Sequence, residues 1–201
     1  MNQAQVVRRL VEEARNGDRA AFQALYEHYV TRIYNFLFRL LGSKEEAEDA
    51  TQQTFLIVLR QLGSLRDPDV IESWIYRIAR NEVYQKFRKK KVDSLGGGDD
   101  EESEVATVEE GRLHANPERT LLNRELGEVL QSVLDGLPLK LREVFVLAVI
   151  QEIRYQEISE IVGRSLLSVK TDIYRARVLA KEKLGRYLEA GRRPQHTSKV
   201  Q

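Results

Sequence analysis

Five cationic, amide and aromatic side chains are spaced so that they share one face of a helix. They are Arg77, Arg80, Asn81, Tyr84 and Arg88, at offsets of 3, 4, 7 and 11 residues from the first. Cations follow a phosphate backbone, and flat rings stack on bases that have left a duplex. The pattern predicts contact with a nucleic-acid strand whose bases are unstacked.

Trp74 lies just upstream and has two interpretations. Its ring could serve as a further stacking platform for a base. It also shares a helix face with the apolar residues Ile71, Ile75 and Ile78, which favours a position largely in the core.

A second nucleic-acid pattern lies near the C-terminus. The turn Gly163-Arg164-Ser165 separates a short helical pattern from a long one, which makes a helix-turn-helix candidate. One face of the long helix carries hydroxyl, phenol and cationic groups that suit base edges and phosphates, or an ordinary solvated surface. Asp172 does not fit this face, because phosphate repels a carboxylate. Its carboxylate would have to pair with a neighbouring Arg or accept a hydrogen bond from a cytosine amino group.

A third surface is predicted within residues 45–62. Asp49, Gln52 and Gln53 form a polar helix face beside Phe55. This arrangement fits an ordinary amphipathic helix or a protein-docking face, and the pattern alone favours the ordinary helix.

Composition excludes several other classes of chemistry. The 201 residues contain no cysteine, and the three histidines are far apart, so a disulfide framework, a metal site and a thiol nucleophile are not expected. The sequence has no phosphate-binding glycine loop, dinucleotide-binding turn or nucleophile elbow, so we expect neither a cofactor nor enzymatic activity. No apolar run reaches the ~20 residues of a membrane span, which predicts a cytoplasmic protein without a membrane partner.

The net charge of +1 conceals three blocks of different charge. Residues 1–92 carry 16 basic and 12 acidic side chains (+4), residues 93–116 carry 1 and 8 (−7), and residues 117–201 carry 15 and 11 (+4). The middle block combines three consecutive glycines with a run of like charges and little apolar surface, which is typical of a flexible linker. Each flanking block is modestly basic, enough for phosphate contact but not for tight non-specific binding.

Hydrophobic periodicity predicts an all-α protein of two small helical domains joined by this acidic linker. Asp18 and a Ser43–Glu46 capping box begin helices, while Gly42 and Pro68 interrupt them. The expected helices cover residues 3–15, 18–42, 43–62, 69–91, 122–135, 139–151, 155–162 and 166–188. The expected domains are residues 1–92 and 118–190, each with its own small core, with a linker at 93–117 and a disordered tail at 191–201.

These motifs, in this order, resemble the extracytoplasmic-function (ECF) sigma factors of the bacterial sigma-70 family. The resemblance rests on three groups of residues. The first is Ala47-Glu48-Asp49 with Gln52, Phe55 and Arg60; the second is Trp74-Ile75-Tyr76-Arg77-Ile78-Ala79-Arg80-Asn81. The third is Leu137-Pro138, Arg142-Glu143-Val144-Phe145, Tyr155-Gln156-Glu157-Ile158, Val169-Lys170-Thr171 and Tyr174-Arg175-Ala176-Arg177.

The resemblance implies a four-helix sigma-2 domain and a four-helix sigma-4 domain. It also implies a binding role for each of the three surfaces. Contacts with the beta-prime clamp of core RNA polymerase are expected at Asp49, Gln52, Gln53 and Phe55. Minus-ten promoter contacts are expected at Arg66, Asp67, Asp69, Val70, Trp74, Tyr76, Arg77, Arg80, Asn81, Tyr84 and Arg88. Minus-thirty-five contacts are expected at Arg164, Ser168, Lys170, Thr171, Tyr174, Arg175 and Arg177.

The resemblance also implies further partners, and the chain departs from the family at two positions. The beta flap of polymerase and an anti-sigma factor are implied partners. Leu167 stands where the family often has Gly before the Ser or Thr that begins the recognition helix, and Asp172 stands where a basic residue is common. Both departures bear on which minus-thirty-five sequence is read.

Two other classes of function compete with a sigma factor. An autonomous helix-turn-helix regulator needs neither the Asp49–Phe55 surface nor the Arg77–Arg88 stripe. A single-strand-binding or ribonucleoprotein module would bind RNA without polymerase. The presence of both surfaces in one chain favours the sigma factor.

Overall fold

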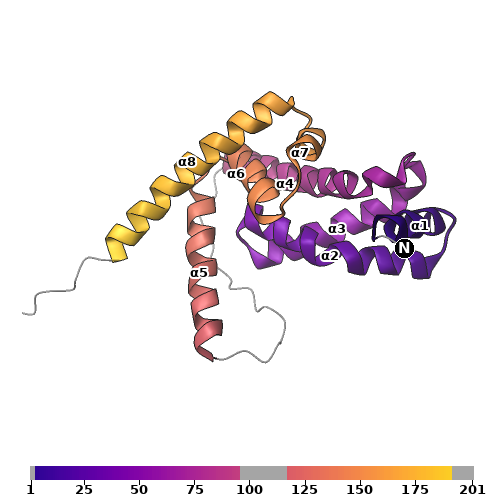
Figure 1. The fold of residues 1–201 in the computed structure, drawn as a ribbon, viewed down its shortest axis with the longest axis horizontal. Coiled ribbons are helices and arrows are strands. Elements are labelled where there is room, and N and C mark those ends of the chain that lie inside the picture. The colour runs from indigo at the N-terminus through magenta and orange to yellow at the C-terminus, as the bar shows by residue number, and fades with distance from the viewer. Residues whose placement is uncertain (1–2, 96–116, 192–201) are drawn as a thin grey trace, which may run out of the picture.

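Local capping signals divide the first half of the chain into four helices. A computed structural model describes residues 3–95 and 117–191 (Figure 1). Asp18 accepts hydrogen bonds from the Ala20 and Ala21 N–H groups, and Ser43 accepts one from the Glu46 N–H, as predicted. Gly42 ends the helix between these caps with a φ of 75°. The helices are α1 (Gln3–Arg15), α2 (Arg19–Leu41), α3 (Lys44–Gln61) and α4 (Ile71–Leu95), with the 3₁₀ turns η1 (Leu62–Ser64) and η2 (Pro68–Val70) before α4.

Residues 117–191 form four more helices. They are α5 (Pro117–Asp135), α6 (Leu139–Phe145), α7 (Tyr155–Val162) and α8 (Leu166–Gly191). Gly163 ends α7 in the left-handed conformation, with a φ of 66°, and the chain turns directly into α8. This is the predicted helix-turn-helix, and the all-α fold is confirmed for the described residues.

The structure corrects several predicted boundaries. α4 extends to Leu95 and α5 begins at Pro117, so helices occupy both ends of the predicted linker, and α8 includes Gly191 of the predicted tail. The predicted helix over 139–151 changes after Phe145 into a π turn, η3 (Val146–Ile150). There the Gln151 N–H donates to the Val146 carbonyl oxygen at 2.9 Å. The remaining linker and tail residues, 96–116 and 192–201, lie outside the described residues.

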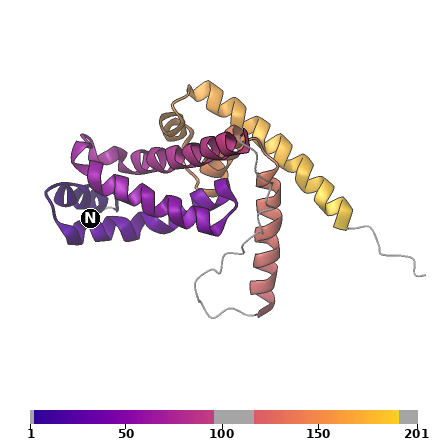
Figure 2. The same ribbon diagram turned by 180° about the vertical axis from the view of Figure 1, so that it is seen from behind.

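The two halves share one continuous apolar core, whereas the sequence predicts two separate ones. Buried side chains from α1–α4 and from α5–α8 belong to the same cluster. α2 contacts α5, α6 and η3, and α4 contacts α7. Figures 1 and 2 show α6 and α7 against one end of the α2–α4 bundle, with α1 at the other end and α5 and α8 projecting outward. The two halves therefore meet in an extensive interface.

Within residues 3–95 and 117–191, no helix is long and apolar enough to cross a membrane. The same residues contain no group of three or more His, Asp or Glu side chains placed to hold a metal ion.

Candidate nucleic-acid and protein-binding surfaces

The five residues Arg77, Arg80, Asn81, Tyr84 and Arg88, here called the α4 stripe, lie on one side of α4. Arg77, Asn81 and Arg88 are exposed, whereas Arg80 and Tyr84 are partly covered. The Arg80 guanidinium lies 4.4 Å from the centre of the Tyr84 ring, which is a cation–π contact. The stripe thus offers three free polar groups and one pre-stacked pair.

The covered part of the stripe lies against a carboxylate from the other half of the chain. Glu143, on α6, is 0% exposed. Its Oε2 accepts a hydrogen bond of 2.6 Å from the Tyr84 hydroxyl and lies 3.1 Å from Arg80 Nε. The Arg80 contact is an ion pair only, because its Nε–H is not aligned for a hydrogen bond. No feature of the local sequence predicts this contact.

The Glu143 contact also changes the acidity of Tyr84. Burial, and then the hydrogen bond to Glu143 and its negative charge, raise the pKa of Tyr84 to about 12. The neutral hydroxyl is the donor, and ionising it would place a second anion beside Glu143. The stabilisation from this contact is therefore fully present below pH 10, the ordinary tyrosine pKa, and is lost as the pH rises toward 12.

We expect Tyr84→Phe to remove one tyrosine that ionises near pH 12 from an alkaline absorbance titration. Tyr187→Phe, which changes an exposed tyrosine on α8, is the matched control and should leave that transition in place. A Tyr84→Phe titration identical to that of the parent chain in this pH range would contradict the buried hydrogen bond.

Two other aromatic residues predicted to contact the minus-ten strand are buried. Trp74 lies in the core, which confirms the favoured sequence interpretation. Tyr76 is fully buried, its ring edge-on to Phe36, and its hydroxyl donates to Gln151 Oε1 at 2.9 Å. The burial of Tyr76 could have been predicted from the sequence, because the helical period places it with Ala79 and Val83 on the apolar face of the helix. Neither ring is open to a DNA strand in this structure.

The loop before α4 exposes its four predicted residues, Arg66, Asp67, Asp69 and Val70. The two carboxylates already have partners. Asp67 accepts a hydrogen bond from the Asp69 N–H at 2.9 Å and so caps η2, while Asp69 lies 3.2 Å from Arg8 Nη1. The side chains of Arg66 and Val70 make no hydrogen bond or ion pair with the other described residues.

The predicted docking face on α3 is polar and partly apolar. Asp49, Gln52 and Gln53 are exposed, but Phe55 is buried, with its ring 4.8 Å from that of Tyr26 in an edge-on contact. The exposed Leu56 and Leu59 were missed by the sequence reasoning, although they follow Gln52 by four and seven residues on the same face.

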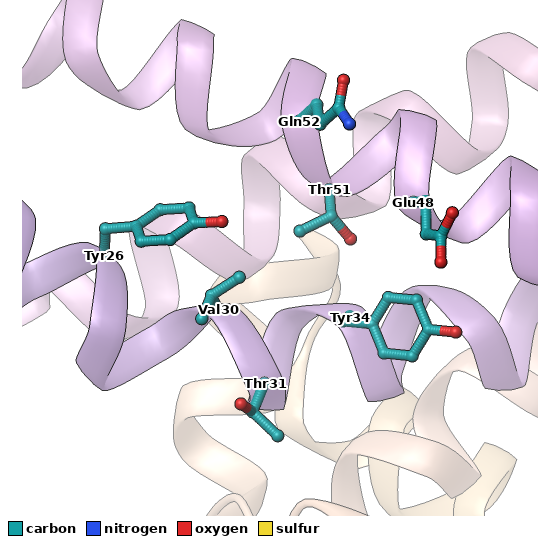
Figure 3. A pocket seen from close by; sticks show the side chains of 7 residues that line it. All are labelled: Tyr26, Val30, Thr31, Tyr34, Glu48, Thr51 and Gln52. Carbon is teal, nitrogen blue, oxygen red and sulfur yellow. The ribbon is translucent and has the colours of Figure 1, made fainter. Parts of the chain in front are cut away.

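A shallow depression adjoins this face between α2 and α3. Figure 3 shows aromatic, hydroxyl and amide groups around it, from residues Tyr26, Val30, Thr31, Tyr34, Glu48, Thr51 and Gln52. Its volume is about 270 Å³. Together, the α3 face and this depression form a mixed surface that suits a protein partner better than an anion.

The first turns of α8 present the predicted polar face. Val169, Ile173, Ala176 and Ala180 are buried, as the period predicts. On the opposite side, Tyr174 is 70% exposed and Ser168 is half-buried, while Lys170, Thr171, Arg175 and Arg177 are exposed. Leu167, one of the two departures from the family pattern, is 76% exposed and adds an apolar group beside this surface.

Asp172 and Arg164 do not belong to that face. Asp172 is only 3% exposed and pairs with Arg164 and with Lys140, the latter at 3.3 Å. Pairing with a neighbouring Arg, one of the two predicted resolutions for Asp172, is confirmed. Arg164 also lies 3.2 Å from Glu143 Oε1, so a residue predicted to contact DNA is instead held inside an ion-pair network.

Arg142 joins the two halves through backbone oxygens. Its Nη1 donates to the Leu40 carbonyl oxygen at the end of α2 and to Asp135 Oδ1, both at 2.9 Å. Its Nη2 donates to the carbonyl oxygens of Asp135, at 2.9 Å, and Leu137, at 3.4 Å. A single buried guanidinium thus satisfies helix-end acceptors from both halves of the chain.

The chain that carries these surfaces matches a known protein family. Residues 25–92 match Sigma-70 region 2, and residues 127–179 match Sigma-70, region 4. The chain is 32% identical over 186 residues to the ECF RNA polymerase sigma factor SigW of Bacillus subtilis, a match that covers 89% of this chain and 97% of that relative. The chain is an ECF sigma factor of the sigma-70 family. The RNA polymerase sigma factor YlaC of Bacillus subtilis is also similar, 31% identical over 174 residues, or 87% of this chain and 98% of YlaC.

Solved structures share the fold of this sigma factor. CnrH, in complex with the cytosolic domain of CnrY, is 24% identical with a TM-score of 0.64 and covers 92% of this chain and 98% of its own. The sigma factor RpoE of Bartonella quintana, in complex with the anti-sigma factor NepR, is 22% identical with a TM-score of 0.66 and covers 82% and 96%.

Membership of the family establishes the general role. The protein is an alternative sigma factor, a promoter-specificity subunit whose partners are bacterial core RNA polymerase and promoter DNA, and its family is non-enzymatic. An autonomous helix-turn-helix regulator is not favoured, because the match to region 2 lies outside the helix-turn-helix. Below, region 2 denotes α1–α4 and region 4 denotes α5–α8.

Proposed function

We propose that the three surfaces divide promoter recognition among them. The α3 face docks on the beta-prime clamp, the α4 stripe with the Arg66–Val70 loop captures the separated minus-ten strand, and the α8 face reads the minus-thirty-five duplex. The observation that carries the proposal is the exposure of Arg77, Asn81 and Arg88 on one side of α4. Cations flanking an amide suit a backbone with bases turned out of the stack.

The rest of the assembly follows from the same proposal. Region 4 contacts the beta flap, and the acidic linker, proposed as residues 93–117 between domains 1–92 and 118–190, occupies the polymerase channel that holds nucleic acid. No group of this chain performs chemistry. The protein works in the cytoplasm, where core polymerase and promoter DNA are. The similar fold of RpoE, solved with an anti-sigma factor, supports an anti-sigma partner here too.

Run-off transcription with core polymerase over a promoter library tests the proposal. Transcripts should appear only with the sigma factor present and should share a minus-ten and a minus-thirty-five element. Failure to bind core polymerase, together with tight duplex binding by the isolated protein, would instead indicate an autonomous regulator. RNA affinity without polymerase, in a filter assay with unstructured RNA, would indicate a single-strand-binding module.

Arg175→Ala is expected to reduce minus-thirty-five recognition. If Arg175 holds a base edge, discrimination at one base pair falls by about 1–3 kcal/mol, while other positions are unaffected. Competition binding of the polymerase holoenzyme to single-base promoter variants measures this. Lys181→Ala, an exposed cation elsewhere on α8, is the control and should leave every position unchanged. A uniform loss across all variants would reassign Arg175 to a phosphate contact.

A further inference from the structure

Glu143 is a buried carboxylate that contacts both promoter-binding elements of the chain. Its Oε2 accepts a hydrogen bond from the Tyr84 hydroxyl and lies beside Arg80, and both of these residues belong to the α4 stripe. Its Oε1 lies 3.2 Å from Arg164, in the turn that leads into α8. One carboxylate of region 4 is therefore surrounded by groups from region 2 and from the helix-turn-helix.

The chemistry of this contact matches that of the strand which the stripe is proposed to bind. A phosphate group also offers anionic oxygens to a guanidinium and to a hydroxyl donor. Arg80 stacked on Tyr84 makes a cation-flanked ring of the kind that receives an unstacked base. Because Glu143 is 0% exposed and its Oε2 lies against Arg80 and Tyr84, a strand must displace this carboxylate to use the side of these two groups that it covers.

Other contacts across the same interface hold the two regions together around Glu143. The Tyr76 hydroxyl donates to Gln151, Arg142 donates to the Leu40 carbonyl oxygen, and Arg39 Nη1 donates to Gln131 Oε1 at 3.2 Å. When the regions separate, Glu143 keeps Arg164 as a partner and regains water, whereas Arg80 and Tyr84 become free. The ion-pair network thus permits an open form in which region 4 is still neutralised.

We propose that Glu143 is an internal competitor of the promoter strand: it closes region 4 over Arg80 and Tyr84, and strand capture requires its release. This inference rests on the proposed strand-binding role of the α4 stripe. It assigns to Glu143 a regulatory contact rather than a part in DNA binding. The closed form therefore weakens strand binding by the free sigma factor.

The test uses the full-length chain without polymerase. Because the sequence contains no cysteine, Gln61→Cys in region 2 and Lys181→Cys in region 4 give two unique spin-label sites, both exposed. We expect a narrow label-to-label distance distribution for the parent chain and a broader, longer one for Glu143→Gln. Affinity for a fluorescent single-stranded minus-ten oligonucleotide should rise about tenfold in Glu143→Gln, the effect of removing one charge-assisted competitor.

Two further variants make the result decisive. Glu160→Gln changes an exposed glutamate of α7 and should leave both the distances and the affinity unchanged. Arg80→Gln should open the chain from the region 2 side while lowering strand affinity. If circular dichroism shows that Glu143→Gln has lost helix, the label distances in Arg80→Gln show whether breaking this contact separates the two regions.

Unchanged distances in both Glu143→Gln and Arg80→Gln would overturn the proposal. A Glu143→Gln chain that opens without binding the oligonucleotide more tightly would overturn it as well. The proposed function fails by a separate measurement, the absence of transcripts with core polymerase, so the two failures are distinguishable.

Discussion

Arg142→Ala is expected to lower the free energy of unfolding of region 4 by about 3–5 kcal/mol, because the buried carbonyl oxygens of Leu40 and Leu137 both lose a donor. Arg142 is buried and donates to the carbonyl oxygens of Leu40, Asp135 and Leu137 as well as to the Asp135 carboxylate. Alanine removes this donor from the carbonyl oxygens at the junction of α2, α5 and α6, whereas Asp135 Oδ1 keeps the Gln131 side-chain amide at 3.1 Å. Each buried acceptor without a donor costs about 1–3 kcal/mol.

Urea unfolding followed by circular dichroism measures this loss, and hydrogen exchange locates it. Exchange should accelerate in α5 and α6 before it does in α1 and α3. The matched control is Arg154→Ala, whose side chain is 83% exposed and pairs only with Glu157 on the surface, so no measurable change is expected. Equal unfolding curves for Arg142→Ala and Arg154→Ala would show that the Arg142 hydrogen bonds contribute no net stability.

Asn81→Ala is expected to reduce open-complex formation about tenfold, which corresponds to one lost hydrogen bond to a base, while leaving closed-complex binding nearly intact. Asn81 is exposed at the centre of the α4 stripe, so its amide is available to a separated strand but has no base edge to bind in a duplex. Arg80→Ala should act in the same direction. Asn81 gives the cleaner test, because Arg80 also contacts Glu143.

Permanganate reactivity of unpaired thymines measures opening, and footprinting of the same complexes measures closed binding. Asn35→Ala, an exposed asparagine on α2, is the control and should affect neither. If Asn81→Ala weakens both steps equally, Asn81 contributes to initial binding rather than to melting.

The parts of this fold that the sequence predicts are those that local interactions determine. Asp18 caps α2 through the N–H groups of Ala20 and Ala21, and Ser43 caps α3 through Glu46, all within three residues. The 3.6-residue period likewise separates Val169 and Ile173, which are buried, from the exposed Tyr174. Such signals require no knowledge of tertiary structure, and the helices and the helix-turn-helix followed from them.

The residues that sequence reasoning placed differently depend on contacts between distant segments. Tyr84 and Glu143 are 59 residues apart, and Arg142 and Leu40 are 102 apart, with the acidic linker between them in both cases. Nothing in the residues around Arg164 reveals that Glu143, 21 residues away, lies within reach of its guanidinium. A polar side chain on a helix is predicted as exposed until the partner that buries it is known.

The α8 face is open in the same structure in which Arg80 and Tyr84 are partly covered. This asymmetry implies an order of events. If the α8 face reads the minus-thirty-five duplex as proposed, the chain can contact that element while Arg80 and Tyr84 are still paired with Glu143 and strand binding is weakened. On the proposal above, the free protein is expected to bind stray single-stranded DNA less tightly while it samples duplex promoters.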